Sequence, residues 1–492
     1  MSLERLRPEV ETFLEALERA QYEALSGRVP AAGVSEVYEA HPALFEPACF
    51  RLLDPPVDDS PEGRRNAHLR EFLAEGIEGD RGRDLTDELL AVEGAADVQV
   101  DGSKIEYRRL PVEIRREPER GRRRRLEDAR LGVVAERLTP LLRRSIEVAH
   151  EVAEELLETS YDRYCETLSG IDFDALGRET DSLLADTEGV HEDLLRWYLR
   201  RVLPGVARDD VQGHDLARLL YGPEHLGAFD GPRMVPRIGA MVEAMGLDPR
   251  AEGRIEYDLE DRPTKTARAF CSPIRVPDEI KLVLRPYGGH DDYATFLHEL
   301  GHALHFGYVN RELPVEFRRL GDNGVTESHA ITFDHLMLVG EFHRRIVETG
   351  DPSDYLRFAA FRELVMLRRY AAKFAYERSL HRKGPAPELA EEYVERLSRA
   401  TGARIPAALY LDDVDPHFYC IRYLRAWMLS GVLHETLRER YDEDWFLNPR
   451  TGDFLRGLWA RGQSEPVEAL AADVGVPRLT FAPLLRMVHA LV

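Results

Sequence analysis

Residues 291–305 read DDYATFLHELGHALH, and this stretch carries most of the chemical information in the chain. Apolar residues surround its histidines, which predicts a largely buried helix. His298 and His302 are four residues apart, so both imidazoles lie on one helix face and can bind one ion. Zinc accepts nitrogen ligands, and a catalytic zinc site uses three protein ligands and leaves a fourth position open. Glu299 is the candidate general base that takes a proton from the attacking water.

A third ligand is expected in residues 321–330, which read GDNGVTESHA. The glycine-containing turn followed by Thr326 predicts the start of a second helix, with Glu327 in its first turn. Asp334 lies two helical turns after Glu327 and is a candidate acceptor for the N–H of a metal-binding histidine. The sequence therefore predicts one zinc ion per chain, held by His298, His302 and Glu327.

Helical periodicity dominates the remainder of the chain. The spacing of apolar residues predicts helices over 126–168, 190–204, 354–382, 387–401 and 420–442. Strands are expected in two places. One is a hairpin with strands at 98–100 and 105–107 around Asp101-Gly102, and the other is a strand at 279–284. The expected fold class is therefore mainly α.

Charge and composition exclude several kinds of protein. The formal net charge of −23 opposes general binding to nucleic acid or to anionic membranes. Residues 120–125 read RGRRRR, which we interpret as a solvated helix start rather than a nucleic-acid patch. The four cysteines are scattered singly, which opposes a disulfide framework or a thiolate zinc site. The first residues, MSLERL, are charged and no long apolar run follows, so we expect a soluble cytoplasmic protein.

The metal motifs resemble those of the thimet oligopeptidase and oligopeptidase F family of zinc peptidases. The stretch 291–305, the placing of Glu327 after His302, and the acid at Asp334 are all similar to that family. Upstream, Lys265–Cys271 is similar to the family's segment leading into a strand on the substrate side. The resemblance covers about residues 255–470.

This resemblance implies a two-lobed helical gluzincin fold with a deep central channel and a small β element beside the metal helix. The channel admits short peptides, which are the implied substrates. On this basis residues 1–250 are expected to be mostly helical and to form part of the channel. Residues 251–492 are expected to form the catalytic zinc-peptidase region.

A second resemblance, to the sister family of angiotensin-converting enzyme, lies near the C-terminus. It rests on Leu313-Pro314-Val315, Ile421-Arg422-Tyr423, Leu429, His434-Glu435 and Leu437. It implies that Tyr423 donates a hydrogen bond to the developing oxyanion. The family also uses a histidine donor, whose place falls on Asp413 here; His417 is the nearby histidine, with Tyr419 as a substitute. Arg422 matches a chloride-binding arginine, with a structural ion pair as the other interpretation.

Three functions stay open from the sequence. The first is an oligopeptidase that hydrolyses short peptides, internally or by removing dipeptides. The second is a metallocarboxypeptidase of the helical HExxH type, which needs a cation such as Arg422 or Arg425 to hold the substrate carboxylate. The third is a non-catalytic zinc-binding or peptide-binding protein, which the presence of Glu299 opposes because a structural zinc site needs no base. The oligomeric state also stays open.

Overall fold

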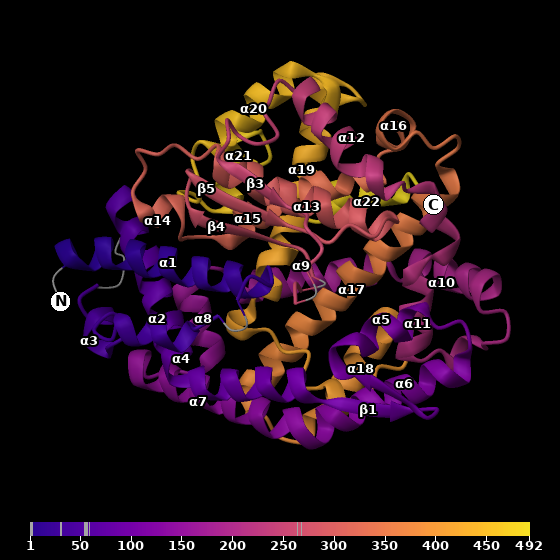
Figure 1. Ribbon diagram of the computed structural model, residues 1–492, viewed down its shortest axis with the longest axis horizontal. Coiled ribbons are helices and arrows are strands. Elements are labelled where there is room, and N and C mark those ends of the chain that lie inside the picture. The colour runs from indigo at the N-terminus through magenta and orange to yellow at the C-terminus, as the bar shows by residue number, and fades with distance from the viewer. Residues whose placement is uncertain (1–2, 30–31, 54–57, 59, 263, 267) are drawn as a thin grey trace. The chain divides into compact units, whose positions relative to one another are not determined.

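The computed structural model describes residues 3–29, 32–53, 58, 60–262, 264–266 and 268–492. Helix makes up 69% and strand 5% of it, so the prediction of a mainly α fold is confirmed (Figure 1). Met1, Ser2 and Ala267, which belong to segments interpreted above, lie outside the described residues. Among the described helices, none combines the length and the apolar character needed to cross a membrane.

The chain divides into two compact units, each built from separate segments. Unit 1 comprises Met1–Gly76, His225–Ala359 and Arg422–Val492, and unit 2 comprises Ile77–Glu224 and Ala360–Ile421. Both units take segments from either side of residue 250. These two units are therefore not the same as the two regions, 1–250 and 251–492, that were expected from the family resemblance. The functional roles expected of those two regions stay predictions.

Unit 1 contains the predicted metal helix and a small sheet. Its elements are α1 (Leu3–Leu25), α2 (Val34–Ala40), α3 (Pro47–Phe50), the first part of α4 (Pro61–Ala95), α12 (Gly231–Ala244), β3 (Ile255–Asp258), β4 (Phe270–Arg275), β5 (Glu279–Val283), α13 (His290–Gly307), α14 (Val315–Arg318), α15 (Asn323–Asp334), α16 (Gly340–Phe342), the first part of α17 (Ser353–Lys383), most of α19 (Cys420–Tyr441), α20 (Pro449–Trp459), α21 (Val467–Asp473) and α22 (Ala482–His489). The strand predicted at 279–284 is confirmed as β5. Strand β4 lies where the family resemblance of Lys265–Cys271 implies a strand, whereas β3 was not predicted.

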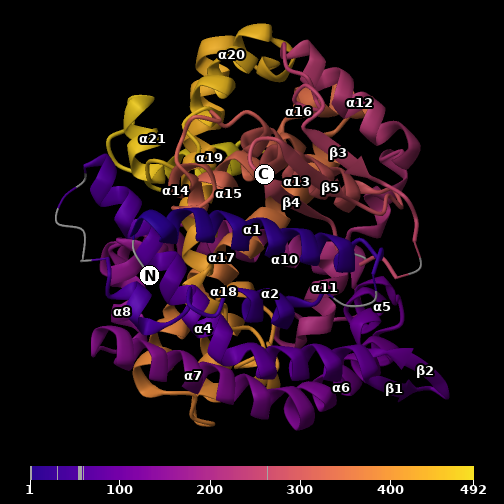
Figure 2. The same cartoon turned by 60° about the vertical axis from the view of Figure 1, so that its left-hand side comes forward.

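The sheet has the order β3-β5-β4, with β3 parallel and β4 antiparallel to β5. Helix α1 runs alongside β4 (Figure 2), and Tyr22 of α1 packs with Ile274 and Val283 in one small core. The metal helix contacts the sheet through Phe296, whose ring meets Tyr257 of β3 edge to face at 5.7 Å. The sheet thus supports α13 along its buried side.

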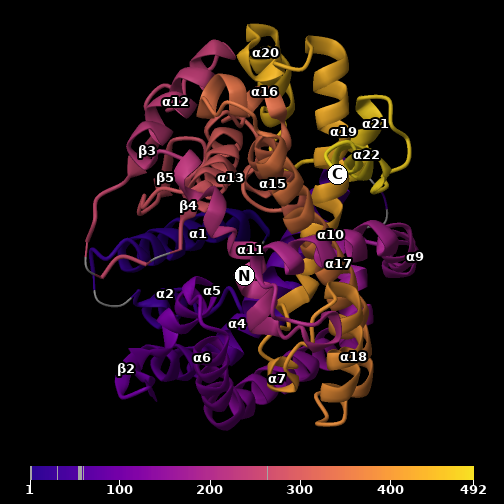
Figure 3. The same ribbon diagram turned by 90° about the vertical axis from the view of Figure 1, so that its right-hand side faces the viewer.

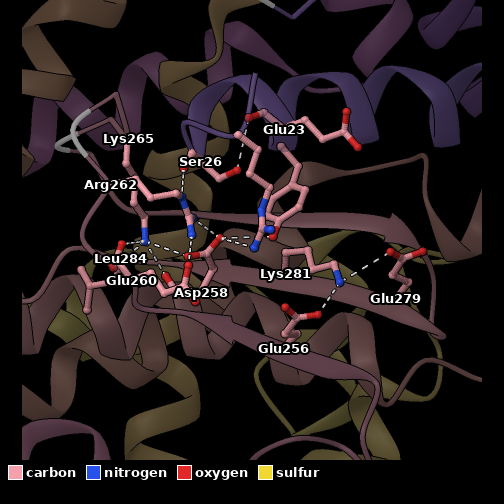
Figure 4. Close-up of polar contacts among 12 residues, drawn as sticks. Glu23, Ser26, Glu256, Asp258, Glu260, Arg262, Lys265, Glu279, Lys281 and Leu284 are labelled. Atoms are coloured by element: carbon pink, nitrogen blue, oxygen red, sulfur yellow. Dashed lines mark hydrogen bonds and ion pairs between the residues drawn. The ribbon is translucent and has the colours of Figure 1, made fainter. Parts of the chain in front are cut away.

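A buried lysine ties the ends of two strands together (Figure 4). The Lys265 ammonium donates to the carbonyl oxygens of Asp258, Glu260 and Leu284 at 2.7–3.0 Å. It also pairs with the Asp258 carboxylate at 3.0 Å. Asp258 ends β3 and Leu284 follows β5, so one cation satisfies carbonyls at the carboxyl ends of both parallel strands. This contact fixes the segment that leads into β4, next to the metal helix.

Unit 2 is helical apart from one hairpin. Its elements are the rest of α4, β1 (Asp97–Val100), β2 (Ser103–Glu106), α5 (Leu110–Arg116), α6 (Arg120–Val133), α7 (Thr139–Leu157), α8 (Tyr161–Ser169), α9 (Phe173–Asp186), α10 (Glu188–Val202), α11 (Gly213–Tyr221), most of α17 and α18 (Leu389–Thr401). Figure 3 shows α18 beside α17, and apolar side chains of both helices share one core.

The predicted helices are present, with one interruption. The helices α10, α17, α18 and α19 match the predicted ranges within two residues. The predicted helix over 126–168 is instead α6, a π-helical turn at Val134–Leu138, α7 and α8. The π turn ends two residues before Pro140, which cannot donate a helical hydrogen bond, and the helix breaks at residues 158–160, between α7 and α8. The hairpin turn at Asp101-Gly102 is confirmed, with both residues at positive φ.

The arginine run is less solvated than the sequence suggested. It does begin a helix, because α6 starts at Arg120 and the Glu119 side chain caps its first N–H groups. Arg123, however, is completely buried and its guanidinium lies 2.9 Å from the Asp215 carboxylate. Arg120 bonds the same carboxylate. The interpretation as a solvated face was therefore wrong for Arg123, because a partner from a distant segment pairs with it.

Candidate metal centre

The metal helix α13 is held at its start by its own acids. Asp291 and Asp292 occupy the first turn, where negative charge is favourable. Asp292 accepts the backbone N–H groups of Tyr287 and Gly288 at 2.5 and 2.6 Å, so the glycine-rich loop folds back onto the helix. Most of the apolar residues of α13 are buried, as predicted.

Helix α15 starts earlier than the sequence suggested. Asp322 is its N-cap and accepts from Gly324 N at 2.9 Å, so the helix begins at Asn323 rather than near Thr326. Glu327 consequently lies in the second turn, not the first. Thr326 and Glu327 therefore both lie within regular helix, and both side chains reach His302 of α13.

The two helices cross closely at a glycine. A Cβ placed on Gly301 would lie 2.6 Å from Ala330 Cα and 2.7 Å from the His329 carbonyl oxygen. Both distances are far below an ordinary contact, so no larger residue fits without separating the helices. Gly301 lies between the two candidate histidines His298 and His302 in sequence and lets the α15 backbone, which carries Glu327, come close to α13.

Three ligand atoms converge where α13 and α15 face each other. Glu327 Oε2 lies 3.5 Å from His298 Nε2 and 3.5 Å from His302 Nε2. Zinc bonds of about 2.0–2.1 Å at tetrahedral angles place neighbouring ligand atoms roughly 3.3–3.4 Å apart. The observed separations therefore match the donor set of a zinc ion with two imidazoles and one carboxylate. The three side chains are 20%, 12% and 5% exposed, which leaves the histidine side reachable from solvent.

The outer nitrogen of each histidine has its own partner. His298 Nδ1 lies 2.8 Å from Asp334 Oδ2, the contact expected for an acid two turns after Glu327. His302 Nδ1 lies 2.8 Å from Thr326 Oγ1, a partner that the sequence interpretation missed. Because Nδ1 of each ring has a partner on the outer side, each Nε2 faces Glu327, and a neutral ring protonated at Nδ1 would present an Nε2 lone pair there. In the sequence, the only sign of this role was that Thr326 directly precedes the predicted ligand Glu327.

The charges around the site favour a cation. Burial alone would raise the pKa of Glu327, but His302 and His298 hold it well below its usual value. Burial likewise disfavours a charged His298, but Asp334 and Glu327 outweigh it and raise the pKa of His298 well above normal. Positive charge is thus stabilised between these groups, which is the environment that a divalent metal needs.

Glu299 is positioned differently from the ligands. It follows His298 on α13 and is close enough to Cys271 of β4 to raise the pKa of that buried thiol, after burial itself. Within the described part of the chain, no hydrogen bond or ion pair engages the Glu299 carboxylate. A carboxylate that is not neutralised by a partner can accept a proton, as a general base must.

The two candidate cationic clamps are not open to a substrate. Arg422 and Arg425 are 6% and 4% exposed. Arg422 is bound by Glu71 and Asp322, and Arg425 by Asp322 and Glu468. The structural ion pair is therefore the interpretation of Arg422 that the geometry supports.

The predicted oxyanion donors belong to different units. Tyr423 is a half-buried residue of α19 in unit 1, with its ring 6.1 Å from that of Trp427. His417 and Tyr419 belong to unit 2. There the His417 ring nitrogens lie 3.5 Å from the Tyr161 hydroxyl and from Glu78.

Asp413, at the family's histidine position, is a structural acid. It accepts from the Tyr393 hydroxyl at 2.8 Å and pairs with Arg369. The roles of Tyr423, His417 and Tyr419 therefore stay predictions.

Two other features of the described residues have the form of a site. Glu377, Asp415 and Cys420 could also hold a metal by their spacing, but the Lys373 ammonium already pairs with Asp415 at 2.6 Å. A cavity of about 590 Å³ in unit 1 is lined partly by α19 and α22, and none of the predicted site residues lines it.

No protein-family model matches this chain, and no curated protein matches it significantly in sequence. The assignment of the site therefore depends on the residues themselves and on their geometry.

Proposed function

We propose that this chain is a zinc-dependent peptidase that hydrolyses short peptides. The observation that carries the proposal is the convergence of three ligand atoms: Glu327 Oε2 lies 3.5 Å from both His298 Nε2 and His302 Nε2, and all three atoms lie within 4.8 Å of one another. The donor set suits zinc, and its outer partners Asp334 and Thr326 supply the orientation that metal-binding histidines need. Two nitrogens and one carboxylate also leave one tetrahedral position for the reaction.

Zinc, when bound, supplies a Lewis acid that polarises the scissile carbonyl and lowers the pKa of water. The Glu299 carboxylate accepts the proton of the attacking water and passes it to the departing amine. Tyr423 donates a hydrogen bond to the oxygen that becomes negative, and His417, or Tyr419 in its place, assists it. These last roles come from the resemblance to converting enzyme.

The preference for short peptides follows from the resemblance to the thimet oligopeptidase and oligopeptidase F family. In that family two helical lobes border a deep channel that excludes folded proteins. We propose the same arrangement here, with residues 1–250 contributing to the channel wall. The carboxypeptidase alternative is less favoured, because its candidate clamps Arg422 and Arg425 are buried and paired with acids.

Digestion of matched synthetic peptides tests the proposal. One peptide has free ends, one is amidated at the C-terminus and one is acetylated at the N-terminus, and the fragments are weighed by mass spectrometry. We expect zinc-dependent cleavage of the free and the acetylated peptide at internal bonds or two residues from the C-terminus. Release of single C-terminal residues that amidation abolishes would indicate the carboxypeptidase instead.

The metal is measured on the same preparation. We expect one zinc ion per chain and loss of cleavage on chelation, with recovery on adding zinc. A protein that contains no transition metal and cleaves none of the peptides would contradict the proposed function. Zinc at one per chain without any cleavage would favour the binding protein.

A further inference from the structure

Helix α15, which carries Glu327, is anchored at its start by a buried carboxylate. Asp322 caps the helix through Gly324 N at 2.9 Å, and its second oxygen accepts Val467 N at 3.3 Å. Arg422 Nη1 lies 2.9 Å from Oδ1, and Arg425 Nη1 lies 2.8 Å from Oδ2. Burial alone would raise the pKa of Asp322, but Arg425 and Arg422 hold it well below normal, so the carboxylate stays ionised.

The two arginines come from α19 but reach different neighbours. Arg422 uses its second Nη for Glu71 of α4, whereas Arg425 uses Nε and Nη2 for Glu468 of α21. The Glu71 side chain is 16% exposed and Glu468 is 52% exposed. Arg422 therefore bridges the buried Asp322 and the partly buried Glu71, while Arg425 connects Asp322 to the exposed Glu468.

Helix α19 also follows α15 beyond this point (Figure 3). Val325 of α15 and Leu429 of α19 share a core, and His434 Nε2 lies 2.9 Å from the Thr332 carbonyl oxygen. These contacts hold the two helices side by side. The ion pair between Asp322 and Arg422 lies at the start of both contacting stretches.

We propose that Arg422 is a positioning residue that, through Asp322, fixes the metal ligand Glu327 relative to Tyr423. Arg422 directly precedes Tyr423, and Asp322 lies five residues before Glu327. A planar guanidinium can hold two carboxylates at a fixed angle, which the single ammonium of a lysine cannot do. The inference rests on the proposed function, in which Glu327 binds zinc and Tyr423 stabilises the oxyanion.

The test is a substitution that keeps the positive charge of residue 422 but changes the shape of the cationic group. Arg422→Lys retains the cation and loses the two-sided fork, and Arg425→Lys is the matched control at the same carboxylate. We expect Arg422→Lys, loaded with zinc, to lower kcat at least tenfold with KM within twofold, and to weaken zinc binding about tenfold. Arg425→Lys should stay within threefold of wild type in kcat and in zinc affinity, measured by competition with a chromophoric chelator.

A double variant distinguishes an effect on the position of Tyr423 from a general loss of structure. If Arg422 acts through Tyr423, Arg422→Lys combined with Tyr423→Phe should be no slower than Tyr423→Phe alone. Should Arg422→Lys fail to fold, Glu71→Gln removes the other anchor of the fork and should lower kcat with the same pattern.

Equal kcat and equal zinc affinity in the two lysine variants would overturn the positioning role while leaving the peptidase intact. A wild-type protein without zinc or cleavage would instead contradict the proposed function itself.

Discussion

Gly301→Ala is the substitution whose effect follows most directly from the packing of the metal centre. The added Cβ would lie 2.6 Å from Ala330 Cα, and the backbone at both positions is helical and cannot rotate away. An ordinary contact needs at least 3.4 Å, so α13 and α15 must separate locally by about 0.8 Å. Metal–ligand distances tolerate deviations of only about 0.2 Å. The helix separation is thus larger than the tolerated change in ligand distance, so Glu327 should no longer reach the metal.

We expect Gly301→Ala to weaken zinc binding by about 10–100-fold, the loss typical when support of a ligand is disturbed. Overpacking of this kind also costs about 1–3 kcal/mol in the free energy of unfolding. Zinc affinity is measured by competition with a chelator, and stability by denaturant unfolding of the metal-free protein.

Gly239→Ala is the matched control, because no atom outside its own helix lies within 4 Å of the added Cβ on α12. It should leave zinc affinity unchanged and raise stability by about 0.5–1 kcal/mol, since alanine favours helix over glycine. If Gly301→Ala binds zinc within twofold of wild type, the close crossing does not set the ligand geometry and the reasoning fails.

Other substitutions test single roles within the site. Glu299→Gln should keep zinc and the fold but lower kcat by about 10²–10⁴; activity within tenfold of wild type in a peptide assay would reject the base assignment. Thr326→Val keeps the shape but removes the acceptor for a metal histidine, so zinc affinity should fall about 10–100-fold, whereas Thr332→Val, on the same helix, should not change it. Tyr423→Phe should lower kcat about 10²–10³ with KM nearly unchanged, and His417→Ala should cost less. An unimpaired Tyr423→Phe enzyme beside a crippled His417→Ala enzyme would show that the donor was misassigned.

The elements that the sequence predicted correctly are those governed by local periodicity. Helices α17 and α18 appear where apolar residues recur every three or four positions, and the hairpin turns at Asp101-Gly102, where positive φ is needed. The ligand pattern of α13 is equally local, because residues four apart on a helix must share a face. For these features the chain needs no information from distant segments.

The tertiary structure determines the contacts between segments that are far apart in sequence. The sequence predicts that Arg123 is a surface cation, but the structure buries it. Burial is possible because Asp215 from another helix compensates its charge. The first turn of α15 was misjudged because its cap, Asp322, is fixed by arginines a hundred residues away. Strand β3 was not predicted, since its pairing with β5 depends on register with a later segment rather than on its own pattern. The sequence alone thus named the three candidate zinc ligands, but only packing at Gly301 brings Glu327 within 3.5 Å of both histidines, because that distance is set by how closely two helices approach.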